Sequence, residues 1–447
     1  MKIKYIKVFY SILALSALLF TGCDNMFEAE VSTNVKSSNV LQSGYPGAVM
    51  MLRGSYQRLG NVADDISVHT AIATDDADEI NGHTTSADFD LGNWVPSNPE
   101  YTIMYAGLHD ARGQADRFLK DYLPNFDLTV NYGGGSVPVA VRKNSIIAYA
   151  TLMRGWSTLY LGLLFNQVNY YAGPRMAPED ALRRAREDFQ EINRLYALTA
   201  NAPEVYFEGI SIKEAANTLL AKAYLQLGVY DSAAIAASKG FTKTTKGSTG
   251  AADGTVTVFY NIAPANLSDI EGNLIYQHVG NKTVVAKSWC VTSWFIKNDS
   301  LDTRIALDTA TTSGSKYTFS ASNDRSLLTN YTLGYKSPFI PSKFCATTVQ
   351  GKGLRILSWQ DNTLTWAEAM AKSGNIAGGI AKLNEVRTGV TKDKGGSVPM
   401  RSAGSLQNAI DDIATERRIE FVAEFGDRFI TCRRLGIKHD NSGAVYA

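Results

Sequence analysis

The chain has 447 residues, a formal net charge of +1 at pH 7, and 45% hydrophobic residues. This length is enough for two ordinary domains or for one large domain with a single core. Because positive and negative charges nearly balance, no basic surface for a polyanion is expected, and nucleic acid is excluded as a predicted partner.

The first 23 residues carry the most informative signal in the chain. Three lysines precede an apolar run, Phe9–Phe20, that is too short to span a bilayer as a mature helix. A small residue, Gly22, directly before Cys23 is typical of a lipoprotein signal peptide. We therefore expect residues 1–22 to be removed and Cys23 to be lipidated, which predicts an exported, membrane-tethered protein. An ordinary secretory peptide that contains a cysteine is the alternative.

Residues 23–43 are polar and poor in large apolar side chains, which predicts a flexible tether, and residues 44–447 are expected to form one domain. After lipidation of Cys23 three cysteines remain, an odd number without a C-x-x-C spacing, so no disulfide framework or zinc site is indicated. The histidines likewise show no metal-ligand spacing. They are His69, His83, His109, His278 and His439.

Apolar residues recur with helical periodicity through most of the remaining chain, which predicts a mainly α fold. The expected helices are Tyr45–Leu59, Tyr101–Tyr122, Ser145–Phe165, Pro178–Leu198, Ile212–Leu227, Asp231–Lys239, Leu364–Lys372, Ile376–Val386 and Leu406–Phe421.

Two distant segments share the spacing of a tight turn between paired helices. Gly228 and Gly374 each stand five residues after an alanine, and an apolar residue follows two positions later. A glycine in the left-handed conformation ends the first helix, and the apolar residue packs back from the second. The pattern resembles the turn of tetratricopeptide repeats.

The region from about 242 to 357 differs from the helical segments because glycine, serine and threonine dominate it. Short β-type runs at Thr255–Tyr260 and Thr283–Val285 predict a few strands inside a long, loop-rich insertion. Because long loops in compact domains usually serve function, we expect ligand contacts there rather than on the helices.

Charged residues continue the apolar stripe of the last predicted helix, which begins with Leu406, Ile410 and Ile413. Unpaired charges on a buried face are costly, so these residues should pair with one another or cap backbone groups. The residues are Glu416, Arg417, Glu420, Glu424 and Arg428. A structural ion-pair network is favoured over the alternative, an acid/base dyad of Glu420 and Glu424.

The same stretch, Glu416–Phe429 with Arg433–Gly436, resembles the C-terminal signature of the SusD/RagB family of outer-membrane lipoproteins. Leu383–Arg387, Leu364–Gly374 and Lys213–Gly228 are similar to further helices of that family. The resemblance implies a SusD-like helical fold with tetratricopeptide-like helix pairs. The chain departs from the family pattern at several points: Phe425 stands where the family has glycine, Ile430–Cys432 replaces the usual segment, and Leu435 replaces a tryptophan.

Family members capture ligands at the cell surface and deliver them to a TonB-dependent, SusC-like β-barrel transporter. The resemblance therefore implies a non-catalytic protein, lipid-anchored in the outer membrane and facing the cell exterior, that binds oligosaccharides or peptides. Sugar rings stack on aromatic side chains, so loop aromatics are the candidate ligand contacts. They are Trp94, Trp289, Trp294, Tyr331, Tyr335 and Trp359.

Three further readings stay open. The acidic run Asp75–Glu79 offers oxygen ligands for a calcium ion, although no glutamate closes the site and a solvated acidic loop is favoured. No other cofactor is expected. A surface glycoside hydrolase is one alternative function, and a helical scaffold that holds other proteins together is another.

Overall fold

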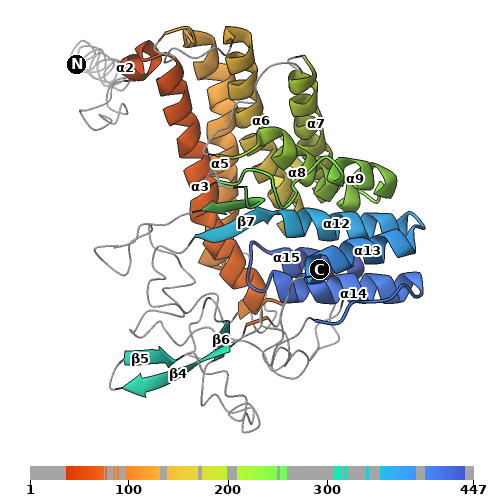
Figure 1. Cartoon of the computed structure of the whole chain (residues 1–447). Helices are drawn as coiled ribbons and strands as arrows, with labels where there is room; N and C mark the ends of the chain where they lie inside the picture. The colour runs from red at the N-terminus through yellow and green to blue at the C-terminus, as the bar shows by residue number, and fades with distance from the viewer. Residues whose placement is uncertain are drawn as a thin grey trace, which may run out of the picture.

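The computed structural model describes residues 37–74, 76–77, 85, 88–89, 97–130, 138–169, 174–198, 209–248, 252–258, 307–313, 316–320, 339–341, 353–388 and 398–437. Helices dominate these residues (Figure 1), which confirms the mainly α class. None of the described helices combines the length and the hydrophobicity that a membrane-spanning helix needs.

Two groups of helices build the body of the molecule (Figure 1), and long helices of the N-terminal half stand side by side in the first group. The first group is α2 (Ser37–Gln42), α3 (Tyr45–Ile72), α5 (Pro99–Arg117), α6 (Val139–Leu164) and α7 (Pro178–Ala197). The second group is α8 (Ile212–Gln226), α9 (Tyr230–Ala237), α12 (Trp359–Lys372), α13 (Ile376–Arg387), α14 (Leu406–Glu420) and α15 (Asp427–Leu435).

Helix α3 is longer than the sequence predicted, because it continues to Ile72 instead of ending at Leu59. Gly60 lies inside this helix, where a glycine usually lowers helix stability. The reason is a close contact: a Cβ at Gly60 would lie 2.4 Å from Cγ1 of Val258. The missing side chain of Gly60 therefore lets Val258, from the insertion, pack closely against α3. Gly60 does not end the helix.

Two helices lie where the sequence predicted none. Helix α2 occupies the end of residues 23–43, so the described part of the predicted flexible tether is helical and not flexible coil. Helix α15 begins after Gly426 in the left-handed conformation and ends at Gly436, also left-handed. Two other helices depart at one end: α6 begins at Val139, and α5 runs into a π-helix, Phe118–Tyr122, and a 3-10 turn, Leu123–Asn125.

Both predicted turns between paired helices are confirmed. Gly228 has a φ of 73° and Gly374 a φ of 93°, which only glycine adopts at little cost. The N–H of Val229 donates to the carbonyl of Tyr224, and that of Asn375 to the carbonyl of Met370, both at 2.9 Å. This six-to-one bond is the helix-ending pattern known as the Schellman motif.

A two-stranded ladder closes the base of the insertion. Strand β3 (Thr255–Val258) pairs antiparallel with β7 (Leu354–Ser358), and β7 runs directly into α12. Strand β3 covers the first four residues of the predicted run Thr255–Tyr260, and the last two lie outside the described residues. Strand β7 was not predicted. The predicted run Thr283–Val285 lies outside the described residues.

Two smaller sheets complete the described strands. A three-stranded sheet with the order β5-β4-β6 lies in the insertion, away from the helices (Figure 1). Its strands are β4 (Leu307–Ser313), β5 (Lys316–Ser320) and β6 (Phe339–Pro341). Strands β1 (Val168–Asn169) and β2 (Arg175–Met176) form a short hairpin between α6 and α7.

The main core lies between α3, α5, α6, α7 and α8, and its largest fully buried side chains include Trp156, Tyr149 and Phe189. A second apolar cluster joins α12, α13 and α14 through Leu364, Leu383 and similar residues. Helix α6, buried along most of its length, is the axis around which the first group packs.

Helix α5 offers a matched test of how closely the helices pack. A Cβ at Gly107 would lie 2.9 Å from Cβ of buried Val62 on α3, whereas a Cβ at Gly113 meets nothing within 4 Å. We expect Gly107→Ala to lower the free energy of unfolding by about 1–2 kcal/mol, because overpacking outweighs the gain in helix propensity. Gly113→Ala should raise it by about 1 kcal/mol. Urea unfolding followed by circular dichroism measures both, and equal effects of the two changes would contradict the packing.

Candidate functional site

The start of α5 is held by a side-chain cap. Asn98 accepts a hydrogen bond from the backbone N–H of Glu100 at 2.9 Å, and Pro99 occupies the first turn. Both features favour helix initiation at this point. The Asn98 amide also donates to the carbonyl oxygen of Thr85 at 2.8 Å and to the Asp88 carboxylate at 3.1 Å. The cap thus ties the segment that precedes α5 to the first turn of that helix.

An aromatic pocket lies where α3, α5, α6 and α15 meet, with a volume of about 280 Å³ that is partly open to solvent. Phe89 and Tyr101 stack in it with ring centroids 4.7 Å apart, and Phe165 packs edge-on against Tyr105 at 5.0 Å. Its lining is almost entirely apolar. The lining residues are Thr70, Ala73, Phe89, Tyr101, Met104, Leu164, Phe165 and Phe429.

Polar groups stand beside these rings. The Tyr105 hydroxyl accepts a hydrogen bond from the Asn169 N–H at 2.9 Å, and the His109 ring lies 4.4 Å from the Tyr105 ring. Burial and then the charge of Arg112 lower the pKa of His109 to about 4, so its imidazole is neutral at pH 7. Burial and then the charge of Asp88 raise the pKa of Tyr101, so its hydroxyl keeps its proton. Apolar rings with adjacent neutral donors and acceptors suit an uncharged polar ligand.

One of the six candidate aromatic residues lies in the described part of the chain. Trp359 begins α12 at the base of the insertion, half-buried, with the Lys243 ammonium 4.6 Å from its ring centroid. It does not line the aromatic pocket. Trp94, Trp289, Trp294, Tyr331 and Tyr335 lie outside the described residues, as does Cys23. Trp94 precedes the Asn98 cap by four positions in the sequence.

The charged signature forms ion pairs, and its partners come from other elements. Arg355 on β7 donates to Glu424 at 2.6 Å through Nε and to Glu420 at 2.9 Å through Nη1. One guanidinium therefore holds the two carboxylates that an acid/base dyad would need. The expectation that the signature residues pair among themselves is wrong for these two, because the cation comes from a strand about 65 residues earlier in the sequence.

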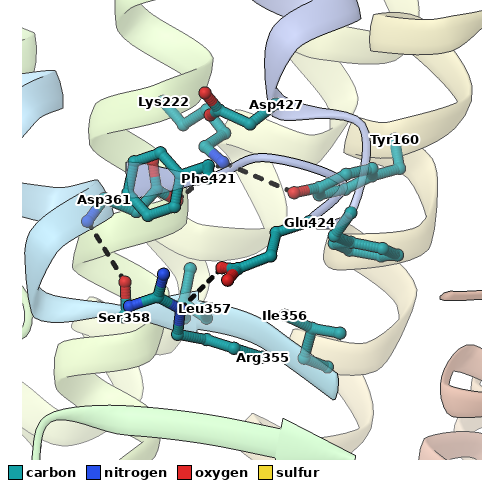
Figure 2. A pocket seen from close by; sticks show the side chains of 11 residues that line it. Tyr160, Lys222, Arg355, Ile356, Leu357, Ser358, Asp361, Phe421, Glu424 and Asp427 are labelled. Atoms are coloured by element: carbon teal, nitrogen blue, oxygen red, sulfur yellow. Dashed lines mark hydrogen bonds and ion pairs between the residues drawn. The ribbon is translucent and has the colours of Figure 1, made fainter. Parts of the chain in front are cut away.

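A second set of pairs lies deeper, around a cavity of about 240 Å³ that is partly open to solvent (Figure 2). Arg417 donates to Asp361 at 2.6 Å and to Asp427, and Lys222 binds the other oxygen of Asp361 at 2.7 Å. Burial opposes ionisation of Asp361, but the charges of Lys222 and Arg417 outweigh it and lower the pKa of Asp361 to about 2. The Lys222 ammonium also reaches the Tyr160 hydroxyl at 3.4 Å.

The same cavity is unsuited to a sugar. Small-molecule sites are mostly apolar, with only a few precisely placed polar groups. Here five of the eleven lining residues are charged. The centroid of the Phe421 ring lies 5.2 Å from the guanidinium group of Arg355 and 5.3 Å from that of Arg417. We therefore assign the cavity to the ion-pair network that holds the helices together.

The remaining signature residues differ in their surroundings. Glu416 accepts a hydrogen bond from Arg387 on α13, and both side chains are buried. Arg428 makes no ion pair within the described part of the chain. Arg418, next to the signature positions, donates to Asp76 at 2.7 Å, and Asp76 is fully buried. Within the acidic run proposed for calcium, Asp76 thus serves a structural ion pair, while Asp75, Asp78 and Glu79 lie outside the described residues.

Phe425, which replaces the family's glycine, keeps a backbone conformation that favours glycine. Its φ is 38°, and Ala423 two residues earlier has a φ of 51°. A left-handed non-glycine residue costs about 1–2 kcal/mol. Two contacts offset this cost: the Phe425 ring packs 4.1 Å from the Tyr160 ring, and its N–H donates to the Ser67 hydroxyl at 2.8 Å.

The sequence did not reveal the aromatic pocket. Tyr101, Met104 and Tyr105 recur at helical spacing on α5, which reads as an ordinary core face. Phe89 and Phe429 come from segments about 340 residues apart, and nothing local marks them as neighbours. The useful signal was the Asn98–Pro99 pair, which predicts a helix start and therefore a bend of the chain near Tyr101.

Removal of Arg355 tests the structural role of the signature. We expect Arg355→Met to lower the free energy of unfolding by about 3 kcal/mol, because Glu420 and Glu424 would lose their shared cation in a partly buried site. The control is Arg183→Met, which removes an exposed pair with Asp180 and should cost less than about 1 kcal/mol. Urea unfolding provides the measurement. A loss no larger than the control's would contradict the network.

No family model and no curated protein matches the sequence. Solved structures do match the fold. A SusD superfamily protein from Bacteroides thetaiotaomicron is 15% identical, with a TM-score of 0.63 over 90% of this chain and 92% of that one. A SusD-like carbohydrate binding protein from Bacteroides vulgatus is 15% identical, with a TM-score of 0.63 over 89% and 84%.

A SusD-like protein from Bacteroides fragilis agrees in the same way, with 13% identity and a TM-score of 0.62 over 92% of this chain and 89% of that chain. Identities this low establish the fold and leave ligand and partners to be tested. Because the agreement spans about nine-tenths of each chain, this protein has the SusD-like fold that its sequence motifs implied.

Proposed function

We propose that the protein is a non-catalytic, cell-surface lipoprotein that binds nutrient oligosaccharides and delivers them to a TonB-dependent, SusC-like β-barrel transporter. The observation that carries this proposal is the aromatic pocket between α3, α5, α6 and α15. The C–H faces of a sugar ring pack on aromatic rings, while its hydroxyls bond to neutral polar groups such as those beside Tyr105.

The position of the pocket supports the same proposal. Tyr101 and Phe165 line it from the first turn of α5 and the end of α6, and each ring is partly exposed. Trp94 precedes the Asn98 cap by four positions, so a predicted ligand aromatic belongs to the segment that leads into the pocket wall. Helix ends thus supply a rigid floor, and the adjoining loop supplies variable contacts.

The carboxylates of the signature argue against a hydrolase. A glycoside hydrolase needs one protonated and one ionised carboxyl group facing the bond to be cleaved. Glu420 and Glu424 instead both accept hydrogen bonds from Arg355, and their side chains are only 9% exposed. The arrangement is suited to holding β7 against the end of α14.

Membrane attachment and transporter partnership rest on the N-terminal signal and on the fold. The segment before Cys23 has the order of a lipoprotein signal. One of the proteins with the same fold is described as carbohydrate binding. A tethered capture protein at the outer surface raises the local concentration of ligand near a transporter entrance.

Isothermal titration of residues 24–447, which contain every described element, tests binding. We expect saturable binding to at least one glycan of a panel that also includes peptides. Tyr101→Leu and Phe165→Leu should each weaken that binding about three- to tenfold, because about 0.5–1.5 kcal/mol of ring stacking is lost while apolar volume is kept. Tyr230→Leu on α9, which removes an aromatic ring outside the pocket, should leave the affinity unchanged.

Each other outcome of this titration contradicts the proposal in a distinct way. Release of shortened glycans would indicate a hydrolase, and it should then be abolished in Glu420→Gln. Binding of peptides alone would replace the ligand class. The absence of detectable binding to every glycan and peptide in the panel would favour a protein–protein scaffold.

The anchor is tested separately in cells. Wild-type protein should incorporate a labelled fatty acid and fractionate with the outer membrane, where added protease reaches it on intact cells. Cys23→Ser should incorporate no label, because the thiol that carries the lipid is gone. Unchanged membrane fractionation of the Cys23→Ser protein would refute the anchor without touching the glycan proposal.

A further inference from the structure

His69 on α3 has the orientation of a metal ligand. Its side chain is 1% exposed, and Nδ1 lies 2.9 Å from the carbonyl oxygen of Asp65. Because a carbonyl oxygen only accepts, Nδ1 carries a proton and donates it. Metal-binding histidines are commonly held by such a bond, which leaves Nε2 to face the cation.

Two carboxylates converge on the same nitrogen. Asp65 lies one helical turn before His69, and Glu100 comes from the first turn of α5. Nε2 of His69 and Oε2 of Glu100 are 3.7 Å apart, and one ligand atom from each of the three residues lies within 4.8 Å of the other two. The second Glu100 oxygen accepts a hydrogen bond from the Thr85 hydroxyl at 3.1 Å, which holds the carboxylate in place.

The cluster is short of positive charge. Asp64 lies beside Asp65 in the sequence, and the Glu100 carboxylate lies nearby, so negative charge gathers at this point. Within the described part of the chain no lysine or arginine pairs with the Asp65 carboxylate. This contrasts with Glu420, Glu424, Asp361 and Glu368, each of which has a cationic partner.

We propose that Asp65, His69 and Glu100 form a binding site for a divalent transition-metal cation such as Zn²⁺. Ligand atoms around tetrahedral zinc lie about 3.4 Å apart, since each bond is about 2.0–2.1 Å long. The 3.7 Å between His69 Nε2 and Glu100 Oε2 is close to this value, and metal binding requires the Asp65 carboxylate, now within 4.8 Å of both, to turn toward them. An imidazole with two carboxylates suits zinc or manganese, whereas calcium prefers oxygen ligands alone.

The cation links α3 to the start of α5 next to the aromatic pocket. The His69 ring lies 5.0 Å from the Phe89 ring, which in turn stacks on Tyr101. The site is therefore a brace for the pocket wall, and it is separate from the acidic run 75–79. The sequence did contain one signal for it, an aspartate and a histidine four residues apart on one helix face.

Metal titration tests the site directly. Residues 24–447, purified without a polyhistidine tag and stripped with EDTA, are titrated with ZnCl₂, and CoCl₂ absorption reports the ligand field. We expect one equivalent bound, with at least tenfold weaker binding in Glu100→Gln and Asp65→Asn. His69→Gln should weaken zinc binding to the same extent. If this change of a buried side chain impairs folding, the two carboxylate variants test the site without it. Asp110→Asn on α5, an exposed carboxylate outside the cluster, is the matched control and should bind as wild type does.

Thermal unfolding gives an independent readout. Saturating Zn²⁺ should raise the Tm of wild type and of Asp110→Asn but not of Glu100→Gln, because a ligand that binds only the folded state stabilises it. Absence of zinc binding by the stripped wild type, or equal affinity in Glu100→Gln, would overturn the proposal and leave a His69–Glu100 ion pair. Tighter binding of CaCl₂ than of ZnCl₂ would overturn the metal class.

Discussion

Buried cations that need carboxylate partners position the C-terminal third of this protein. Arg417 on α14 holds Asp361 on α12 and Asp427 on α15, and Asp361 also binds Lys222 on α8. A buried charge left alone costs several kcal/mol, so the helices dock only where these groups meet. This docking places α15 beside α3 and α6 and brings Phe429 into the aromatic pocket. The pocket therefore depends on ion pairs that do not touch it.

The turn between α14 and α15 shows how such a network tolerates strain. Phe425 and Ala423 have left-handed backbone conformations, which glycine adopts at little energetic cost. The Phe425 ring reaches Tyr160, whose hydroxyl lies within the charge network through Lys222. The strain of this turn is therefore offset by the apolar contact that the Phe425 ring adds to the core.

Local sequence patterns predicted a helix well where neighbouring residues specify both its apolar face and its two ends. Helices α7, α8 and α13 agree with their expected bounds within a few residues at most. Helix α12 ends at the expected residue, Lys372, but begins five residues early, at Trp359. Helix α3 was cut short at Gly60 because the sequence does not show that Val258 fills the space of the missing side chain. Strand β7 was missed because its partner β3 lies across the whole insertion.

The sequence by itself determined the helical class, the glycine turns at Gly228 and Gly374 and the resemblance to the SusD-like fold, and it predicted a lipoprotein signal. These depend on periodicity and on backbone preferences within a few residues. Only the tertiary structure decided which charges pair and where the aromatic rings gather. Arg418 and Asp76 are 342 positions apart, and such a partnership follows from how whole helices pack rather than from any local pattern.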